Sequence, residues 1–414
     1  MNGHRKLAAW TWVGLCTLAI FSIIPLARLI QNFVSSRWGR TAFGFAVLAG
    51  VGAAFLGLAY VLFFRLRIRS LPRYLWLAAV LGLYVYFTLK LWRAPEEAVH
   101  FLEYGLLGFL LFRALSLTIH DKSIYLVGFL AGTLVGTADE ILQWLTPGRY
   151  WDFRDVGLNA LAAGLIQVAL WKGIRPGIIG EKTGPKSLRR VSALLAIQVV
   201  ILGLCASNTP ARTARFAARF PSLSFLLREE PMYEFTKKHD DREAGVFYSR
   251  LSLEGLEADD INRSDEWARI LNEWKDKKYA DFLSHYSPLI HPFLYEMRIH
   301  LFRRDRKLEE RRRAKTDKAR REALFIAFRE NRILERHFRR TLEKSGYKWE
   351  AGTRTEAAMA ENASKPYRSP VSAGRFQVKE SHLWTGIILL LLGLAAANLI
   401  AARTARPPEP PKPN

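Results

Sequence analysis

Eight stretches of this sequence are long and apolar enough to cross a bilayer, and they constrain the fold more than any other feature. A helix needs about 20 apolar residues to cross about 30 Å of hydrocarbon. The stretches are residues 7–27, 43–64, 74–91, 100–118, 124–145, 156–172, 190–206 and 383–402. We therefore predict an all-α polytopic membrane protein with about eight transmembrane helices and a mainly helical extracytoplasmic insert.

Basic residues near the ends of these stretches predict the orientation, because Lys and Arg in short loops are retained in the cytoplasm. They concentrate in the connections 65–73 and 172–190, which follow the second and sixth stretches. We expect a multi-pass protein of the cytoplasmic (inner) membrane, with both termini in the cytoplasm. Residues 207–382 are then extracytoplasmic.

The spans divide the chain into segments of different character. These are N-terminal helices (1–89), a core (90–172), a cytoplasmic loop with the seventh span (173–206), a basic insert (207–382), a last span (383–402) and a Pro-rich cytoplasmic tail (403–414). The formal charge of +23 would suggest nucleic acid for a soluble protein. Here much of the charge lies beside spans, where it serves topology and anionic headgroups, so we expect no nucleic-acid partner.

The insert combines a short strand pattern with long helical ones. Residues 246–253 alternate like a strand, residues 264–283 open with a capping signal, and 293–344 have helical spacing. Residues 298–340 contain 17 basic and 7 acidic side chains. This region is either an amphipathic helix or helical hairpin with a solvated basic face, or a surface for anionic envelope lipid or a polyanionic partner. Residues 350–380 are rich in small residues and are expected to be a flexible connection.

Polar side chains inside the apolar third of the chain indicate where function lies. Each charged group in a span costs about 2.5–3.5 kcal/mol, so such groups persist where they face each other or a wet cavity. The predicted topology brings three segments to the outer interface. Their polar residues are His100 and Glu103, then Asp139, Glu140 and Gln143, then Arg149, Asp155 and Asn159.

A glycine repeat supports this convergence. Gly128, Gly132 and Gly136 recur every four residues, which permits close approach of a neighbouring helix. The same face continues to Asp139, Glu140 and Gln143, so we expect the acidic group to face the packed interior.

The residue types suit either catalysis or binding. His100, Glu103, Asp139 and Glu140 are candidate acid–base groups, and Arg149 offers a planar fork for a phosphate or carboxylate. We assign Gln143, Arg149, Asp155 and Asn159 to binding. Alternatively, these groups only satisfy one another and lock the bundle. Although the set contains metal-ligand types, no His-x-x-x-His or Cys pair accompanies them, so we predict no metal and no cofactor.

The segments HFLEYGLLGFLL and DEILQWLTPGRYWDFRDVGLNALAAGL resemble the VanZ-like family of bacterial membrane proteins over about residues 90–172. The matched positions are His100, Tyr104, Glu140, Gln143, Pro147, Gly148, Arg149, Asp155 and Asn159. Tyr104 joins the binding set through this resemblance. Two positions depart from the pattern: Glu97 stands where many members have Lys, and Leu142 where many have His.

The resemblance implies a role in the bacterial cell envelope, and its name-giver is associated with low-level resistance to the glycopeptide antibiotic teicoplanin. Three functions follow as alternatives. The first is binding of a membrane lipid or lipid-linked cell-wall precursor. The second is a membrane-embedded hydrolase or transferase acting on such a headgroup, so whether the protein is an enzyme stays open. The third is a scaffold whose basic insert binds a partner.

Overall fold

The computed structural model describes residues 2–180, 182–229, 231–359, 365–372, 378 and 380–404. The chain forms two compact units. Unit 1 comprises Met1–Leu204 and Trp384–Asn414, and unit 2 comprises Cys205–Leu383. The predicted Pro-rich tail lies outside the described residues from position 405 onward.

Unit 1 carries the membrane-spanning part of the chain. Within the described residues, eight helices are long and apolar enough to cross a membrane, which confirms the predicted fold class. The long helices are α1 (Asn2–Ile23), α3 (Thr41–Tyr60), α4 (Leu71–Lys90), α5 (His100–Leu115), α6 (Ser123–Trp144), α7 (Phe153–Val168), α8 (Pro185–Ala206) and α16 (Glu380–Thr404). Shorter elements extend or connect them: η1 (Ile24–Leu26), α2 (Ala27–Trp38), η2 (Val61–Arg65), η3 (Pro95–Val99) and η4 (Ala169–Ile174).

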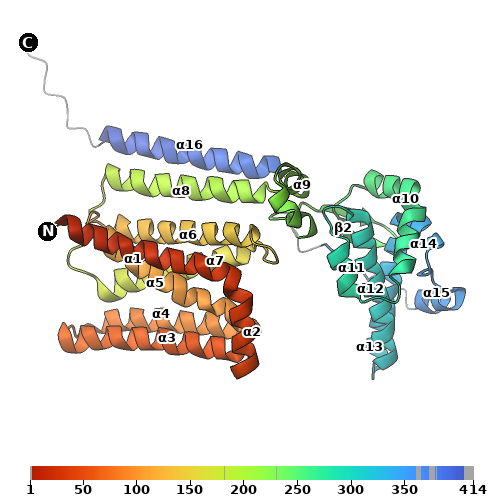
Figure 1. Ribbon diagram of the computed structural model, residues 1–414, viewed down its shortest axis with the longest axis horizontal. Helices are drawn as coiled ribbons and strands as arrows, with labels where there is room; N and C mark the ends of the chain where they lie inside the picture. Colours follow the sequence, from red (N-terminus) through yellow and green to blue (C-terminus); the bar gives the residue numbers. More distant parts are fainter. Residues whose placement is uncertain are drawn as a thin grey trace, which may run out of the picture. The chain divides into compact units, whose positions relative to one another are not determined.

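The long helices run side by side, and the beginning of α1 and the end of α16 lie at the same end of the bundle (Figure 1). The opposite end holds the start of α5, the end of α6 and the start of α7. Eight crossings place the beginning of α1 and the end of α16 on the same side of the membrane, whichever side that is. The protein is therefore a multi-pass membrane protein, and the cytoplasmic location of its termini is still a prediction.

Helix α2 differs from the sequence prediction, which ended the first span at residue 27 and expected a loop after it. The chain bends at η1, which contains Pro25, a residue that lacks the backbone N–H needed to continue a helix. Helix α2 then runs across the end of the bundle (Figure 1). Its Leu29, Phe33 and Trp38 are exposed. An exposed apolar face beside basic residues is typical of a helix in the membrane interface.

The glycine repeat of α6 packs against α7, as predicted. A Cβ atom at position 132 would lie 2.8 Å from Cβ of Ala163, and one at position 136 would lie 2.6 Å from Cβ of Asn159. Both distances are shorter than real Cβ atoms tolerate. The glycines therefore let α6 and α7 approach closely, and this approach places the end of α6 beside the start of α7.

We predict that Gly132→Ala destabilises unit 1 by about 1–3 kcal/mol, because the added methyl group overpacks the contact with Ala163. Gly157→Ala in α7 is the matched control, since nothing lies within 4 Å of a Cβ atom there. The control should be neutral or stabilising, because Ala favours helix over Gly. Thermal unfolding in detergent measures both variants, and equal effects would show that α6 and α7 do not meet at Gly132.

Unit 2 is mainly helical with one antiparallel hairpin. Strand β1 (Lys237–Asp241) pairs with β2 (Gly245–Ser249) in the register Lys237 to Ser249. The helices are α9 (Pro210–Arg219), η5 (Pro221–Arg228), α10 (Leu253–Glu273), α11 (Tyr279–His285), α12 (Pro292–Arg313), α13 (Asp317–His337), α14 (Arg339–Lys344) and α15 (Ala351–Ala358). Its core includes Phe247, Trp267, Phe293, Leu301 and Phe338.

Three local predictions for unit 2 can be compared with these elements. The helical hairpin of α12 and α13 is confirmed, and the strand predicted over 246–253 is confirmed only as far as Ser249. The helix predicted over 264–283 begins earlier, because Ser252 caps α10 by accepting a hydrogen bond from the Gly255 amide at 3.1 Å, and α10 ends earlier, at Glu273. The flexible connection over 350–380 is wrong in its described parts: α15 is helical, and Tyr367 and Ser369 are buried.

Candidate functional site

A cavity of about 370 Å³ lies at the end of unit 1 where α2 crosses the bundle. One part of its lining is apolar and comes from α1, η1, α2, α3 and η3: Ile20, Ile23, Ile24, Ala27, Ile30, Phe43 and Val99. The other part is polar: Arg28, Gln31, Glu96, Glu97, His100, Glu103, Asp139, Gln143, Arg149, Tyr150 and Asp155. Six of the nine predicted site residues therefore share one cavity.

A hydrogen-bond network fixes the end of α6. The Tyr104 hydroxyl donates to Asp139 Oδ2 at 3.0 Å. The Gln143 amide donates to Glu140 Oε1 at 3.0 Å and lies 3.3 Å from Asp139 Oδ2. Arg149 in turn donates to Gln143 Oε1. Tyr104 and Glu140 are fully buried behind the cavity wall, so they position polar groups from within the bundle.

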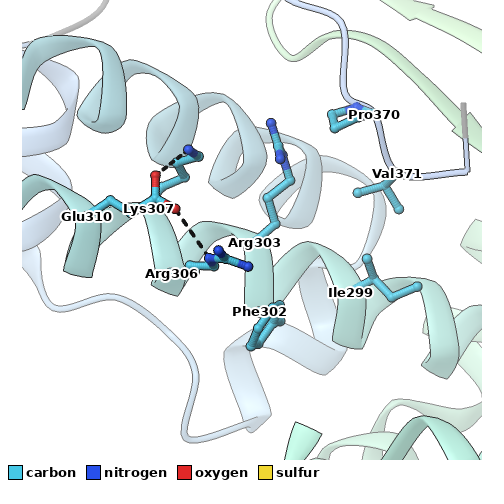
Figure 2. Close-up of a pocket in the computed structure, with 8 residues that line it drawn as sticks. All are labelled: Ile299, Phe302, Arg303, Arg306, Lys307, Glu310, Pro370 and Val371. Carbon is cyan, nitrogen blue, oxygen red and sulfur yellow. Dashed lines mark hydrogen bonds and ion pairs between the residues drawn. The ribbon is translucent and has the colours of Figure 1, made fainter. Parts of the chain in front are cut away.

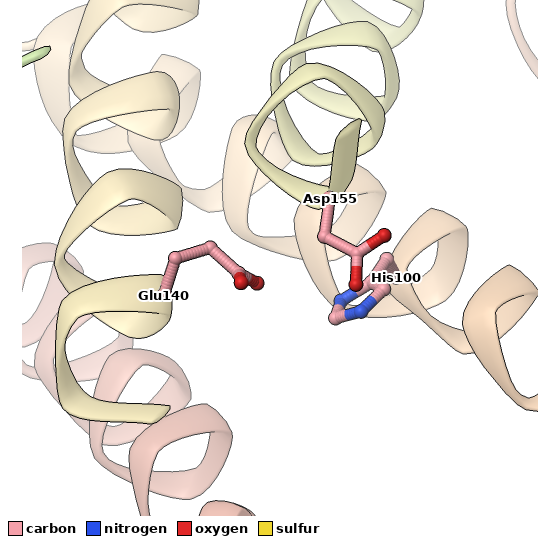
Figure 3. A group of neighbouring side chains, drawn as sticks. All are labelled: His100, Glu140 and Asp155. Carbon is pink, nitrogen blue, oxygen red and sulfur yellow. The ribbon is translucent and has the colours of Figure 1, made fainter. Parts of the chain in front are cut away.

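Glu140, His100 and Asp155 bring one polar atom each to a common point, although they come from α6, α5 and α7. One ligand-type atom of each lies within 4.8 Å of the other two. Figure 3 shows the Glu140 carboxylate reaching from α6 toward the neighbouring side chains of Asp155 and His100. His100 Nδ1 also lies 3.4 Å from Glu103 Oε2, one turn further along α5.

Asn159 is a predicted site residue that lies outside this arrangement. It is fully buried, does not line the cavity, and its amide lies 3.5 Å from the Gly136 carbonyl. Asn159 follows Asp155 by four residues on α7, as the sequence indicates. It lies one turn deeper, however, where the close contact of α6 and α7 covers it. Its position suits packing between helices.

Four charged or amide residues of the cavity were not among the predicted site residues. Glu96 accepts from Arg40 and, at 2.9 Å, from the Gln31 amide. Glu97 pairs with Arg154 at 2.5 Å. The position where many VanZ-like proteins have Lys is therefore occupied here by a carboxylate that is paired with an arginine. Arg28 is the fourth of these residues. The sequence offers little reason to select these four residues, because they lie between the predicted spans, where charged residues are common.

Unit 2 contains a separate basic cleft of about 420 Å³, shown in Figure 2. Each of its three cations has an acidic partner. Arg306 and Lys307 both reach Glu310 (Figure 2), and Arg303 Nε lies 2.8 Å from Glu330 Oε1. Because two carboxylates offset most of the charge of these three cations, the cleft is a weaker candidate for anion binding than its composition suggests.

The same compensation extends along α12 and α13. Arg336 pairs with Asp241 at 2.6 Å, and Arg332 pairs with Glu243 at 2.8 Å. Arg311 pairs with Glu356. These acidic residues lie outside residues 298–340. The count of 17 basic and 7 acidic residues within that range therefore overstates the net positive charge of this surface.

Comparison with known proteins agrees with the membrane-spanning part of this description. Residues 14–175 match the family model described as VanZ/LLP1, so this segment of the chain is VanZ-like. The match begins well before residue 90, where the sequence resemblance begins, and it includes α2 and the part of α1 from residue 14 onward, both of which contribute to the apolar wall of the cavity. No curated protein and no solved structure matches the chain.

Proposed function

We propose that this VanZ-like membrane protein binds the polar headgroup of a lipid or lipid-linked cell-wall precursor in the cavity at the end of unit 1. The observation that carries the proposal is the two-sided lining. Isoleucines of α1, η1 and α2 form an apolar wall that suits an acyl or prenyl chain. Carboxylates, an imidazole and guanidinium groups form the opposite wall, which suits a headgroup.

The size and chemistry of the cavity are consistent with this ligand class. A volume of about 370 Å³ lies within the range of about 300–1,000 Å³ typical of small-molecule sites. Arg149 and Arg28 offer forks for a phosphate or carboxylate. Asp139, Gln143 and Asp155 offer acceptors for hydroxyl and amine groups. A headgroup with both anionic and hydrogen-bond-donating parts, such as a phosphate-linked sugar, fits this distribution.

Filling the cavity tests the proposal without altering its charges. We predict that Ala27→Trp reduces the amount of co-purified lipid or precursor at least about tenfold, because the indole occupies the apolar wall. Leu29→Trp is the matched control, since Leu29 lies two residues away, is 67% exposed and does not line the cavity. Native mass spectrometry of the purified protein measures the bound species. Equal binding by both variants would refute the proposal.

Acid–base catalysis on the same headgroup is a second candidate function. The meeting of Glu140, His100 and Asp155 favours it, because a general acid and a general base must both lie within reach of one substrate atom. Glu140→Gln should then retain the bound headgroup and abolish its conversion. A variant that converts its ligand at the wild-type rate would remove catalysis by Glu140 from consideration.

An effect on glycopeptide susceptibility is the cellular consequence we propose for headgroup binding. Expression in a susceptible bacterium should raise the inhibitory concentration of teicoplanin, and Ala27→Trp should abolish the increase. A scaffold acting through unit 2 would instead keep the increase in Ala27→Trp and lose it when residues 230–370 are deleted.

The turn between α12 and α13 is the part of unit 2 that we propose for an anionic envelope partner. Arg312, Arg313, Lys315, Lys318 and Arg321 are exposed there. Replacement of all five by Gln should weaken binding to vesicles rich in anionic lipid, and the wild-type binding should fall as salt increases. Binding that is independent of these residues would contradict this role.

A further inference from the structure

We propose that Glu140, His100 and Asp155 bind a divalent transition-metal ion, of the kind represented by Zn²⁺ and Mn²⁺. This inference goes beyond headgroup binding and does not depend on it. It also differs from the sequence prediction of no metal, because the three ligands come from three helices and form no local motif.

The geometry is the first argument. One ligand atom from each residue lies within 4.8 Å of the other two. Bonds from a tetrahedral Zn²⁺ ion to nitrogen or oxygen are about 2.0–2.2 Å long, so two of its ligand atoms are about 3.4 Å apart. Binding therefore requires side-chain rotations that bring the three ligand atoms closer together. Figure 3 shows that the Glu140 carboxylate and the Asp155–His100 pair already face a common point.

The charge of Glu140 is the second argument. Its side chain is fully buried, and no Lys or Arg nitrogen among the described residues lies within 4.0 Å of its carboxylate. The nearby guanidinium groups face other partners: Arg149 donates to Gln143, and Arg154 pairs with Glu97 and lies 3.8 Å from Asp155 Oδ1. A buried carboxylate without a cation is strongly unfavourable. A bound metal ion supplies the missing positive charge.

Unsatisfied oxygen atoms are the third and independent argument. Asp139 is 2% exposed and lines the cavity, yet its Oδ1 accepts no hydrogen bond from any described residue. Oδ1 of Asp155 likewise accepts no hydrogen bond from a described residue, although Arg154 Nε lies 3.8 Å from it. Buried acceptors without donors are rare, and each requires an explanation such as an ion or water. Here both atoms belong to residues beside Glu140 and His100.

The surroundings also resemble those of metal ligands, which are usually oriented by hydrogen bonds from a second layer of residues. Gln143 donates to Glu140 Oε1 at 3.0 Å, and Arg149 fixes Gln143. The Asp152 amide lies 3.4 Å from Glu140 Oε2. These contacts hold Glu140 in one orientation.

The ligand types select the class of metal. Imidazole favours Zn²⁺ over Mg²⁺, whereas two carboxylates admit Mn²⁺ as well. Within the divalent series, Zn²⁺ binds a given nitrogen and oxygen site more tightly than Mn²⁺. We therefore expect affinities in the order Zn²⁺, Mn²⁺, Mg²⁺.

Titration of the full-length protein in detergent, after treatment with a chelator, tests the proposal. Isothermal calorimetry with Zn²⁺ and Mn²⁺ should show one site per chain, and Mn²⁺ electron paramagnetic resonance should report its immobilisation. His100→Ala, Glu140→Gln and Asp155→Asn should each weaken binding at least about 10- to 100-fold. His120→Ala, which removes an exposed histidine outside the cavity, is the matched control and should bind like the wild type.

Two further measurements keep the outcome decisive. Thermal unfolding without metal separates loss of the site from loss of the fold, and Asp155→Asn serves where Glu140→Gln does not fold. Ala27→Trp should retain the metal site while it loses the headgroup, so the two proposals fail separately. Absence of a stoichiometric site in the wild type, or wild-type affinity in all three variants, would overturn the metal proposal.

Discussion

Replacement of Arg250 by Met is expected to lower the free energy of unfolding of unit 2 by about 3–5 kcal/mol, the cost of breaking a buried ion pair from one side. Arg250 lies between two carboxylates whose side chains are fully buried. Its Nε and Nη2 atoms donate to Glu234 at 2.7 and 2.8 Å, and its Nη1 atom donates to Glu296 at 3.1 Å. Without Arg250, both negative charges lose this buried cationic partner.

Arg269→Met is the matched control for this prediction. Arg269 pairs with Glu273 at 2.6 Å, but its side chain is 62% exposed, so the pair contributes less than about 1 kcal/mol. Hydrogen exchange of the β2 and α10 amides in the full-length protein measures the stability of unit 2 directly. If Arg250→Met differs from the control by less than about 1 kcal/mol, the buried ion pair does not stabilise unit 2.

Glu330→Gln is expected to destabilise unit 2 by about 3 kcal/mol or more, since the substitution keeps the volume and removes the charge. Glu330 is fully buried and accepts four hydrogen bonds from residues distant in sequence. These come from His300 Nδ1 at 2.6 Å, Arg303 Nε at 2.8 Å, the Tyr367 hydroxyl at 2.6 Å and the Ser369 hydroxyl at 2.9 Å. Loss of the last two should also expose residues 365–372 to proteases.

The pH dependence of unit 2 follows from the same group. Burial raises the pKa of Glu330, but His300, Tyr367 and Arg303 outweigh it and hold the pKa below its ordinary value. The unfolded chain therefore binds a proton at a higher pH than the folded chain does. Stability from Glu330 is present above the ordinary carboxyl pKa of about 4.5 and is lost as pH falls through the lower folded value.

Glu309→Gln provides the comparison for both experiments on Glu330, because its side chain is 66% exposed. Urea unfolding from pH 7 down to pH 3 should show a smaller acid-induced loss in Glu330→Gln than in Glu309→Gln. Parallel curves for the two variants would mean that Glu330 is not held ionised by its neighbours.

Hydropathy and spacing were sufficient to predict most of unit 1. The eight spans follow from runs of apolar residues, and the contact at Gly132 follows from the four-residue glycine repeat. Helix α2 escaped prediction because Arg28, Arg37 and Arg40 resemble a charged loop. Its exposed Leu29, Phe33 and Trp38 form a pattern that is hard to distinguish from scattered apolar residues in a loop.

The approach of His100, Glu140 and Asp155 could be anticipated from topology, since helix ends at one membrane surface are near one another. Which atoms meet could not, because side-chain direction depends on packing. Asn159 shows this limit: its spacing from Asp155 is right, but Gly136 covers it. The pairing of Glu97 with Arg154 likewise joins η3 to the first turn of α7, and no sequence pattern links these two segments.

Unit 2 was harder to predict because its charges are balanced across long sequence distances. The basic residues of α13 pair with Asp241 and Glu243, which lie almost a hundred residues earlier. The segment around Tyr367 and Ser369 has the composition of a flexible connection, yet Glu330 draws it into the core. A count of local charge or of small residues contains no information about such partners.

Site-specific photocrosslinking tests most directly whether the cavity of unit 1 holds one class of headgroup. A photoreactive phenylalanine analogue replaces Tyr150, which lines the cavity, or Tyr86, which is 56% exposed on α4 and does not line it. At position 150, we predict adducts with a single headgroup class, and their loss in Ala27→Trp. At position 86, the adducts should reflect the bulk lipid and remain in Ala27→Trp. The same lipid mixture at both positions, unchanged by Ala27→Trp, would contradict headgroup binding in the cavity.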